Sequence, residues 1–140
     1  MKQSQQIVLI TGGSSGIGLA LAKKFMENDN TVIITGRNLS KLKAVQKAFP
    51  KIHIYQNDVT NDIEVKILDD NIQEKFGGID ILINNAGIMN LVNAGNENND
   101  LQKQMQEIEI NYNSPIRLLH YFLPQLKTSN NAVLVNVSSG

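Results

Sequence analysis

The sequence predicts a three-layer α/β fold built on a doubly wound parallel sheet with the strand order 3-2-1-4-5. Two observations support this prediction. Short apolar runs rich in β-branched residues alternate with helical patterns along the 140 residues, and a glycine-rich turn at residues 11–18 follows the first run. Such alternation implies a parallel sheet with helices on both faces. Right-handed crossovers then give the order 3-2-1-4-5, in which a ligand lies at the carboxyl ends of strands 1 and 4.

Each element has a local justification in the sequence. β-branched residues predominate in the apolar runs, and residues that interrupt the apolar pattern mark the ends of each run. Ser40 and Asn61 precede the second and third helices as N-caps, and Gly77-Gly78 ends the third helix. Residues 90–100 are rich in asparagine and lack periodicity, which predicts a mobile loop near the rim of the site. The expected strands are 7–11, 31–35, 52–56, 80–84 and 132–137, and the expected helices are 17–28, 40–49, 62–76 and 101–126.

The turn between the first strand and the first helix predicts a phosphate-binding site. Three of its glycines have the spacing G-x-x-x-G-x-G, and a helix begins directly after them. A helix N-terminus presents unpaired backbone N–H groups, and glycines leave room for a pyrophosphate to approach them. A tight strand-to-helix connection is the structural alternative, because such turns also favour glycine. The cofactor-binding residues predicted here are Gly12, Ser14, Ser15, Gly16, Ile17 and Gly18.

Four segments in order resemble the short-chain dehydrogenase/reductase family. Thr11 leads the glycine turn, Asn84-Asn85-Ala86-Gly87 matches the NNAG motif, Asn111 matches the helix asparagine, and Ser138-Ser139 matches the end of the serine-bearing strand. Residues 83–88 and 136–140 are most similar to the DltE-like oxidoreductases of that family. The resemblance implies a Rossmann-type domain over residues 1–140, cut after strand 5, which corresponds to the N-terminal portion of a complete member.

The resemblance also implies how further residues act. Asp58 and Val59, after the third strand, match the pair that contacts adenine, and a helix-preceding turn is the structural alternative. Asn85, Ala86 and Gly87 match residues around the adenosine ribose, although a buried asparagine can serve only to satisfy backbone groups.

The catalytic residues that the resemblance implies are Asn111, at a helix kink supported by Pro115, and Ser139, which orients the substrate. A solvated helix asparagine is the alternative for Asn111.

The residues after the second strand favour NADP(H) over NAD(H). Relatives that prefer NAD usually carry a carboxylate at the position of Gly36, and none is present. Arg37 can hold the 2′-phosphate of NADP, because a planar guanidinium forms paired hydrogen bonds with phosphate oxygens. The alternative is an exposed loop arginine.

The family's catalytic Tyr-x-x-x-Lys motif is missing from the sequence. The residues four positions after the three tyrosines are Val59, Ile116 and Gln125. We therefore expect a short-chain oxidoreductase for a carbonyl or alcohol substrate, present as a truncated chain that is inactive alone.

Two other functions remain open. One is a non-catalytic dinucleotide-binding module that forms a homo-oligomer through the apolar, uncharged strand at residues 132–137. The other is a serine hydrolase, because Gly12-Gly13-Ser14-Ser15-Gly16 also satisfies G-x-S-x-G. That reaction needs a histidine in a loop, whereas His120 is expected within the long helix.

Composition narrows the partners and the location. Thirteen basic and thirteen acidic residues give a net charge of zero, so no basic surface for nucleic acid or an anionic membrane is expected. The sequence has no cysteine, and its two histidines lack the spacing of a metal site. We therefore expect a cytoplasmic protein that binds no metal, nucleic acid or membrane.

Overall fold

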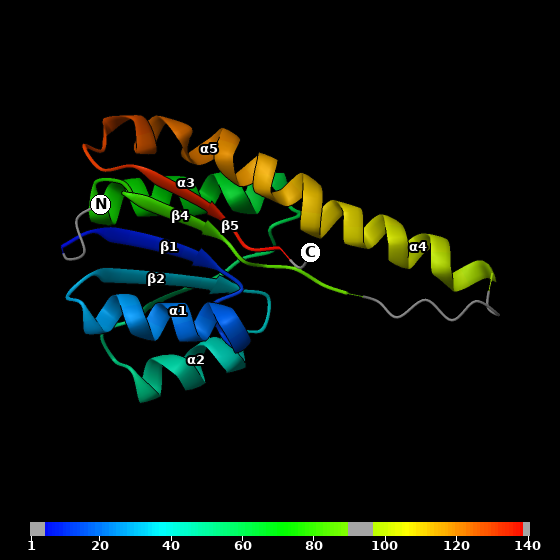
Figure 1. Cartoon of the computed structure of the whole chain (residues 1–140), viewed down its shortest axis with the longest axis horizontal. Helices are drawn as coiled ribbons and strands as arrows, with labels where there is room; N and C mark the ends of the chain where they lie inside the picture. Colours follow the sequence, from blue (N-terminus) through cyan, green and yellow to red (C-terminus); the bar gives the residue numbers. More distant parts are fainter. Residues whose placement is uncertain (1–4, 90–96, 139–140) are drawn as a thin grey trace.

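A computed structural model describes residues 5–89 and 97–138, and in it five parallel strands form one sheet (Figure 1). The strand order is β3-β2-β1-β4-β5, which confirms the predicted fold class. Val8 of β1 pairs with Val32 of β2 on one side and with Ile81 of β4 on the other. The strands are β1 (Ile7–Thr11), β2 (Thr31–Gly36), β3 (His53–Gln56), β4 (Ile81–Asn84) and β5 (Val133–Asn136).

Helices cover both faces of the sheet, as the alternation of elements predicts (Figure 1). Two helices, α1 and α2, pack on one face, and α3 and α5 pack on the other. The helix α4 continues through a π-helical turn, η1, into α5. The helices are α1 (Gly16–Glu27), α2 (Leu39–Ala48), α3 (Asp62–Phe76), α4 (Glu97–Ile108), η1 (Glu109–Asn113) and α5 (Ser114–Thr128). In the described part of the chain, none of these helices is both long and apolar enough to cross a membrane.

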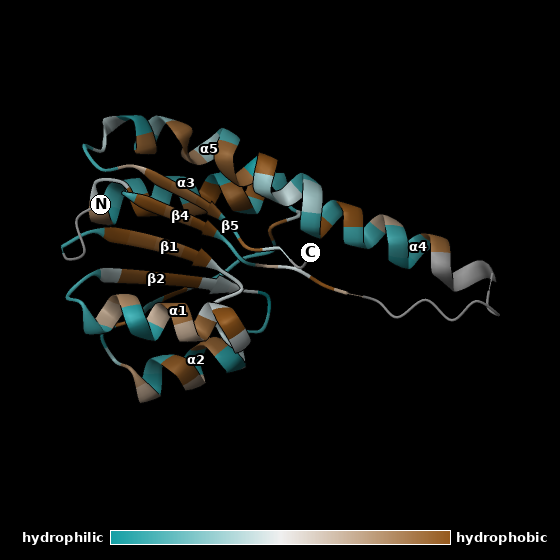
Figure 2. Cartoon of the chain, in the orientation of Figure 1, coloured by the Kyte–Doolittle hydropathy of each residue, from teal (hydrophilic) through white to brown (hydrophobic). Residues whose placement is uncertain are grey.

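The core has two halves because successive side chains of a strand point to opposite faces of the sheet. Leu9, Ile33 and Leu82 lie on the face covered by α3 and α5, where they join Phe122. Val8 and its alternating neighbours form the second half against α1 and α2. The central strands are hydrophobic along their length (Figure 2), as parallel strands buried on both faces must be.

The outer strand β5 differs from the central strands in its exposure. Leu134 and Val135 are 40% and 36% exposed, although β5 pairs in register with β4. The other edge of β5 has no neighbouring strand among the described residues.

Helix ends agree in part with the predicted caps. Asn61 caps α3 by accepting a hydrogen bond from the Glu64 backbone, and Gly77 ends that helix in the left-handed region at φ 76°. The prediction for α2 was wrong: Asn38, not Ser40, is the N-cap, and its side chain accepts from the Lys41 backbone.

The predicted loop at residues 90–100 is wrong for its last four residues, because α4 begins at Glu97. Residues 90–96 lie outside the described residues. The single long helix predicted for 101–126 is also interrupted by the five residues of η1.

Candidate cofactor-binding site

A cleft of about 770 Å³ lies at the carboxyl ends of the strands, beside β1 and β4. These two strands flank the point at which the chain order of the sheet reverses, and ligands bind at such a point in open α/β sheets. The volume is within the range of small-molecule sites. The lining residues are Gly12, Ser14, Ser15, Thr35, Gly36, Arg37, Asn38, Lys41, Asn57, Asp58, Val59, Asn85, Ala86, Gly87, Ile88 and Ile110.

The glycine turn forms the floor of this cleft. Gly12 adopts φ +66°, and a Cβ atom there would lie 2.9 Å from the Ala86 Cα. At Gly18 a Cβ would lie 2.3 Å from the Gly12 carbonyl oxygen and 2.4 Å from the Asn85 side-chain nitrogen. Gly16 has open space around it but a φ of +54°. The three motif glycines are therefore required for different reasons: close approach at two of them and backbone conformation at two.

Asn85 and Thr11 join the glycine turn to the end of β4. The Asn85 side-chain amide donates to the Thr11 carbonyl at 3.2 Å and to the Gly12 carbonyl at 3.1 Å. In return the Thr11 hydroxyl accepts from the backbone N–H of Asn85 at 3.1 Å and of Ala86 at 3.0 Å. The amide of Asn85 thus holds the turn, and the backbone of Ala86 and Gly87 lines the cleft beside it.

The N-terminus of α1 opens beside the turn. Ser15 is the N-cap residue, yet its side chain makes no capping hydrogen bond, so its hydroxyl does not satisfy the helix donors. Ser14 and Ser15 both line the cleft, whereas Gly16, Ile17 and Gly18 follow in the first turn of α1 and do not line it. Ile17 is 63% exposed, and the first turn of α1 can offer its backbone N–H groups to an anionic ligand.

Positive charge lies at the end of the cleft beyond β2. Arg37 follows β2 directly and lines the cleft, and its backbone carbonyl accepts from the Gln56 side chain at 3.0 Å. Lys41, in the first turn of α2, lines the same cleft. Lys41 was not predicted from the sequence; its position three residues after the Asn38 cap, in the first turn of α2, could have indicated it.

Asp58 and Val59 line the cleft opposite the glycine turn. One carboxylate oxygen of Asp58 accepts from the Thr60 backbone at 2.9 Å and from its hydroxyl at 2.8 Å. The Asp58 backbone N–H donates to Glu64 at 2.7 Å. The loop is therefore held by its own contacts with the first turn of α3, and Val59 packs its side chain into the core.

Two buried oxygen atoms in the cleft lining lack a partner in the described structure. They are Oδ1 of Asn57 and Oγ1 of Thr35, and neither residue was predicted. Buried polar atoms are normally hydrogen-bonded, so unpartnered ones beside a glycine cradle and two cations suit a ligand with polar groups and phosphates. This donor and acceptor set fits a dinucleotide.

Asn111 lies in a neighbouring cavity of about 690 Å³ together with Ser138. Asn111 belongs to the π-helical turn η1, and its side chain forms a pair of hydrogen bonds with Ile88. Its Oδ1 accepts from the Ile88 N–H at 2.8 Å, and its Nδ2 donates to the Ile88 carbonyl at 2.6 Å. Ser139 lies outside the described residues.

None of the described tyrosines lines the cleft. Desolvation raises the pKa of the Tyr55 phenol, and desolvation together with the negative charge of Asp62 raises that of Tyr121. A tyrosine acting as a general acid near neutral pH needs the opposite shift. Neither His53 nor His120 lines the cleft.

The fold is a doubly wound α/β sheet, and its cleft lies at the switch point, where such sheets bind their ligands. The model of the short chain dehydrogenase family matches residues 6–140. The chain therefore belongs to the short-chain dehydrogenase family, whose members are oxidoreductases that use an NAD(P) dinucleotide.

Individual relatives agree with this assignment. The chain is 37% identical over 140 residues to the uncharacterized oxidoreductase DltE of Bacillus subtilis, covering 100% of this chain and 56% of that protein. It is 36% identical to the uncharacterized oxidoreductase Rv1543 of Mycobacterium tuberculosis, covering 96% of this chain and 41% of that protein. A short-chain dehydrogenase from Streptomyces avermitilis superimposes with a TM-score of 0.87 at 28% identity, covering 99% of this chain and 50% of that one. The chain thus spans about half the length of the relatives it matches.

Proposed function

We propose that residues 1–140 form the dinucleotide-binding part of an NADP(H)-dependent oxidoreductase that acts on a carbonyl or alcohol. The observation that carries this proposal is the composition of one cleft. The glycine turn lines this cleft. Arg37 and Lys41 line it beside Gly36, a position at which the sequence has no carboxylate. A 2′-phosphate needs cations at this place, whereas a free ribose hydroxyl needs an acidic acceptor.

The residues of the chain have separable roles in this function. When bound, a reduced nicotinamide supplies the hydride that reduces a carbonyl carbon. The first turn of α1 binds pyrophosphate through backbone N–H groups, and Ser14 and Ser15 offer hydroxyls beside it. Arg37 binds the 2′-phosphate, and Asp58 and Val59 lie beside the adenine. Asn111 fixes the Ile88 backbone, which lines both the cleft and the neighbouring cavity.

We also propose that these 140 residues do not turn over substrate by themselves. No tyrosine in the sequence is followed four residues later by lysine. A positioned general acid contributes about 10²–10⁴-fold to rate, so binding without measurable reduction is the expected behaviour. Steady oxidation of NADPH by the purified chain in the presence of carbonyl substrates would overturn this part of the proposal.

The test is a titration with NADPH and NADH, followed by nicotinamide fluorescence or calorimetry. NADPH should bind more tightly than NADH, and Arg37→Ala should remove most of that difference. A hydrogen bond between charged groups contributes about 1.5–3 kcal/mol, so the Kd for NADPH should rise roughly 10- to 150-fold. Lys43→Ala is the matched control, because Lys43 is an exposed cation of α2 that does not line the cleft. Equal binding of both nucleotides by the wild-type chain would refute the NADP preference.

A second candidate function is a binding module that self-associates through β5. It is favoured by the exposure of Leu134 and Val135 on a strand whose outer edge is unpaired in the described structure. Exposed apolar edge strands promote pairing between chains, and a lysine on the edge opposes it. Sedimentation should show a concentration-dependent dimer that Leu134→Lys disperses and Asn131→Lys leaves intact. A wild-type monomer at high concentration would contradict self-association.

A further inference from the structure

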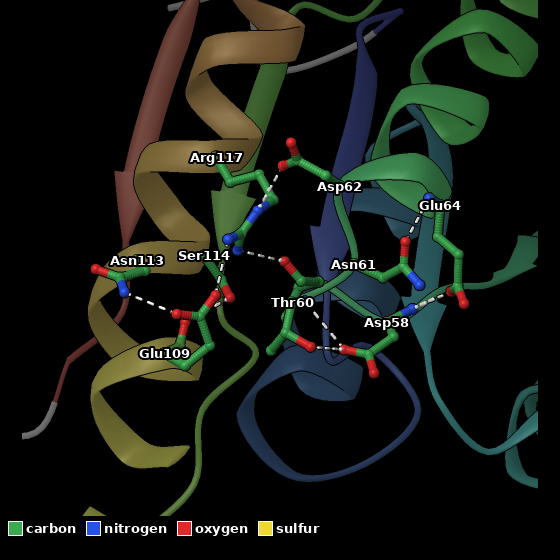
Figure 3. Close-up of polar contacts among 10 residues, drawn as sticks. Asp58, Thr60, Asn61, Asp62, Glu64, Glu109, Asn113, Ser114 and Arg117 are labelled. Carbon is green, nitrogen blue, oxygen red and sulfur yellow. Dashed lines mark hydrogen bonds and ion pairs between the residues drawn. The ribbon is translucent and has the colours of Figure 1, made fainter. Parts of the chain in front are cut away.

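Arg117 of α5 connects three segments that are distant in the sequence (Figure 3). Its Nε donates to Asp62 in the first turn of α3 at 2.8 Å. One terminal nitrogen donates to the backbone carbonyl of Val59 at 3.1 Å, and the other donates to the Glu109 carboxylate at 2.7 Å. The side chain is only 19% exposed. Its carboxylate partners are more exposed, Asp62 at 68% and Glu109 at 36%.

Glu109 connects this arginine to the π-helical turn. It is the first residue of η1, and its backbone carbonyl accepts from both the backbone N–H and the hydroxyl of Ser114, the latter at 2.8 Å. Its second carboxylate oxygen accepts from Asn113 at 2.7 Å. Arg117 and Asn113 thus hold one carboxylate from two sides (Figure 3). Asn111 belongs to the same turn, η1.

The segments that Arg117 joins both contribute walls to the cofactor cleft. Val59 lies on the wall formed by the loop after β3, and Ile110 lies on the wall formed by η1. Asn111, next to Ile110, holds the backbone of Ile88, which also lines the cleft. A movement of η1 relative to the Val59 loop would therefore change the width of the cleft.

We propose that Arg117 is a positioning residue that sets the spacing between these two walls and thereby the affinity for a ligand spanning both. The inference rests on the proposed function as a dinucleotide-binding site. Arg117 itself does not line the cleft, so it acts through Val59 and Glu109. Its planar fork presents donors in three fixed directions, which a lysine ammonium on a flexible stem does not reproduce. The rest of the loop is held locally by Glu64 and Thr60, and these contacts do not reach η1.

The test compares a ligand that spans the cleft with one that occupies one end. NADPH extends over both walls, whereas adenosine 2′,5′-bisphosphate reaches only the side of Arg37 and Val59. In Arg117→Gln the Kd for NADPH should rise at least fivefold, while that for the bisphosphate should change less than twofold. Arg117→Lys should give an intermediate loss for NADPH. Lys66→Gln is the control, because it removes an equal charge from exposed ion pairs of α3.

Amide hydrogen exchange provides a readout that needs no ligand. The Ile88 N–H group donates a hydrogen bond to Asn111 of η1, and it should exchange faster in Arg117→Gln while the amides of β1 stay unchanged. If Arg117→Gln fails to fold, Glu109→Gln weakens the same link and should give the same pattern more mildly.

The outcomes separate the two proposals. Failure of the wild-type chain to bind either ligand would refute the proposed function, and the exchange experiment would still decide the role of Arg117. Binding by the wild-type chain with equal losses for both ligands in Arg117→Gln, or with no loss, would overturn the positioning role. So would unchanged exchange at Ile88.

Discussion

Gly18→Ala tests whether the glycine turn is determined by close packing. The substituted Cβ would lie 2.3 Å from the carbonyl oxygen of Gly12 and 2.4 Å from the side-chain nitrogen of Asn85. Neither neighbour can move freely. The Gly12 carbonyl belongs to a backbone held at φ +66°, and the Asn85 amide donates two hydrogen bonds to that same turn. The added methyl group must therefore displace α1 or break the contacts of Asn85.

The magnitude follows from two opposing effects. Alanine favours a helix over glycine by up to about 1 kcal/mol. Overpacking in a closely packed site costs about 1–3 kcal/mol, and contacts with a fixed backbone carbonyl belong in the upper part of that range. We expect a net loss of about 1–2 kcal/mol in the free energy of unfolding. For a chain of this size that loss corresponds to roughly 3–8 °C in Tm.

Thermal unfolding followed by far-ultraviolet circular dichroism measures this loss. Gly36→Ala is the matched control, because the same methyl group there would meet its nearest neighbours at an ordinary 3.6 Å. We expect the Tm of Gly36→Ala to stay near that of the wild-type chain, and NADPH binding by Gly18→Ala to weaken as the turn shifts. A Tm for Gly18→Ala equal to or above that of the wild-type chain would refute the packing argument.

Two further predictions concern stability. Phe122→Ala should lower the free energy of unfolding by about 3–5 kcal/mol in chemical denaturation, because Phe122 is fully buried between α3, α5 and the sheet; a loss below about 1 kcal/mol would contradict its place in the core. The hydrogen bond from Asn113 and the ion pair with Arg117 lower the pKa of the Glu109 carboxyl. The unfolded chain therefore binds the Glu109 proton more tightly than the folded chain does. The stabilisation by the ionised Glu109 carboxylate is complete above the ordinary carboxyl pKa and is lost as pH falls through the lowered pKa. The stability difference between the wild-type chain and Glu109→Gln should therefore be present at pH 7 and narrow below about pH 4.3; a gap independent of pH would argue against it.

Local sequence patterns were sufficient to predict the sheet and most helix ends. Leu9 and Ile10 face opposite halves of the core because strand side chains alternate, and an apolar residue at both positions requires helices on both faces. Asn61 and Gly77 were predictable because a cap is satisfied within its own turn. The sequence predicted Ser40 as the cap of α2, but Asn38 can also cap, and only the backbone conformation decides between the two residues.

The periodicity of the apolar residues could not predict that the long helix is interrupted. An α-helix and a π-helical turn differ by one residue in the spacing of a hydrogen bond, and Pro115 marks the region of the irregularity without fixing its form. The structure places the irregular pairing at Glu109 and Ser114, where a serine hydroxyl adds a second donor to the released carbonyl. That local compensation involves residues five apart, which a 3.6-residue pattern does not register.

The candidate site shows the difference between predicting a residue and predicting the atoms that act. The NNAG motif placed Asn85 correctly beside the cleft, but both hydrogens of its amide are used by the carbonyls of Thr11 and Gly12. Its side chain therefore shapes the glycine turn and has no donor left for a ligand, so the proposed function assigns the ligand contacts of this motif to Ala86 and Gly87. Arg117 was absent from the sequence prediction for the complementary reason. Its partners lie up to 58 positions away, and only the packing of α5 against α3 brings them together.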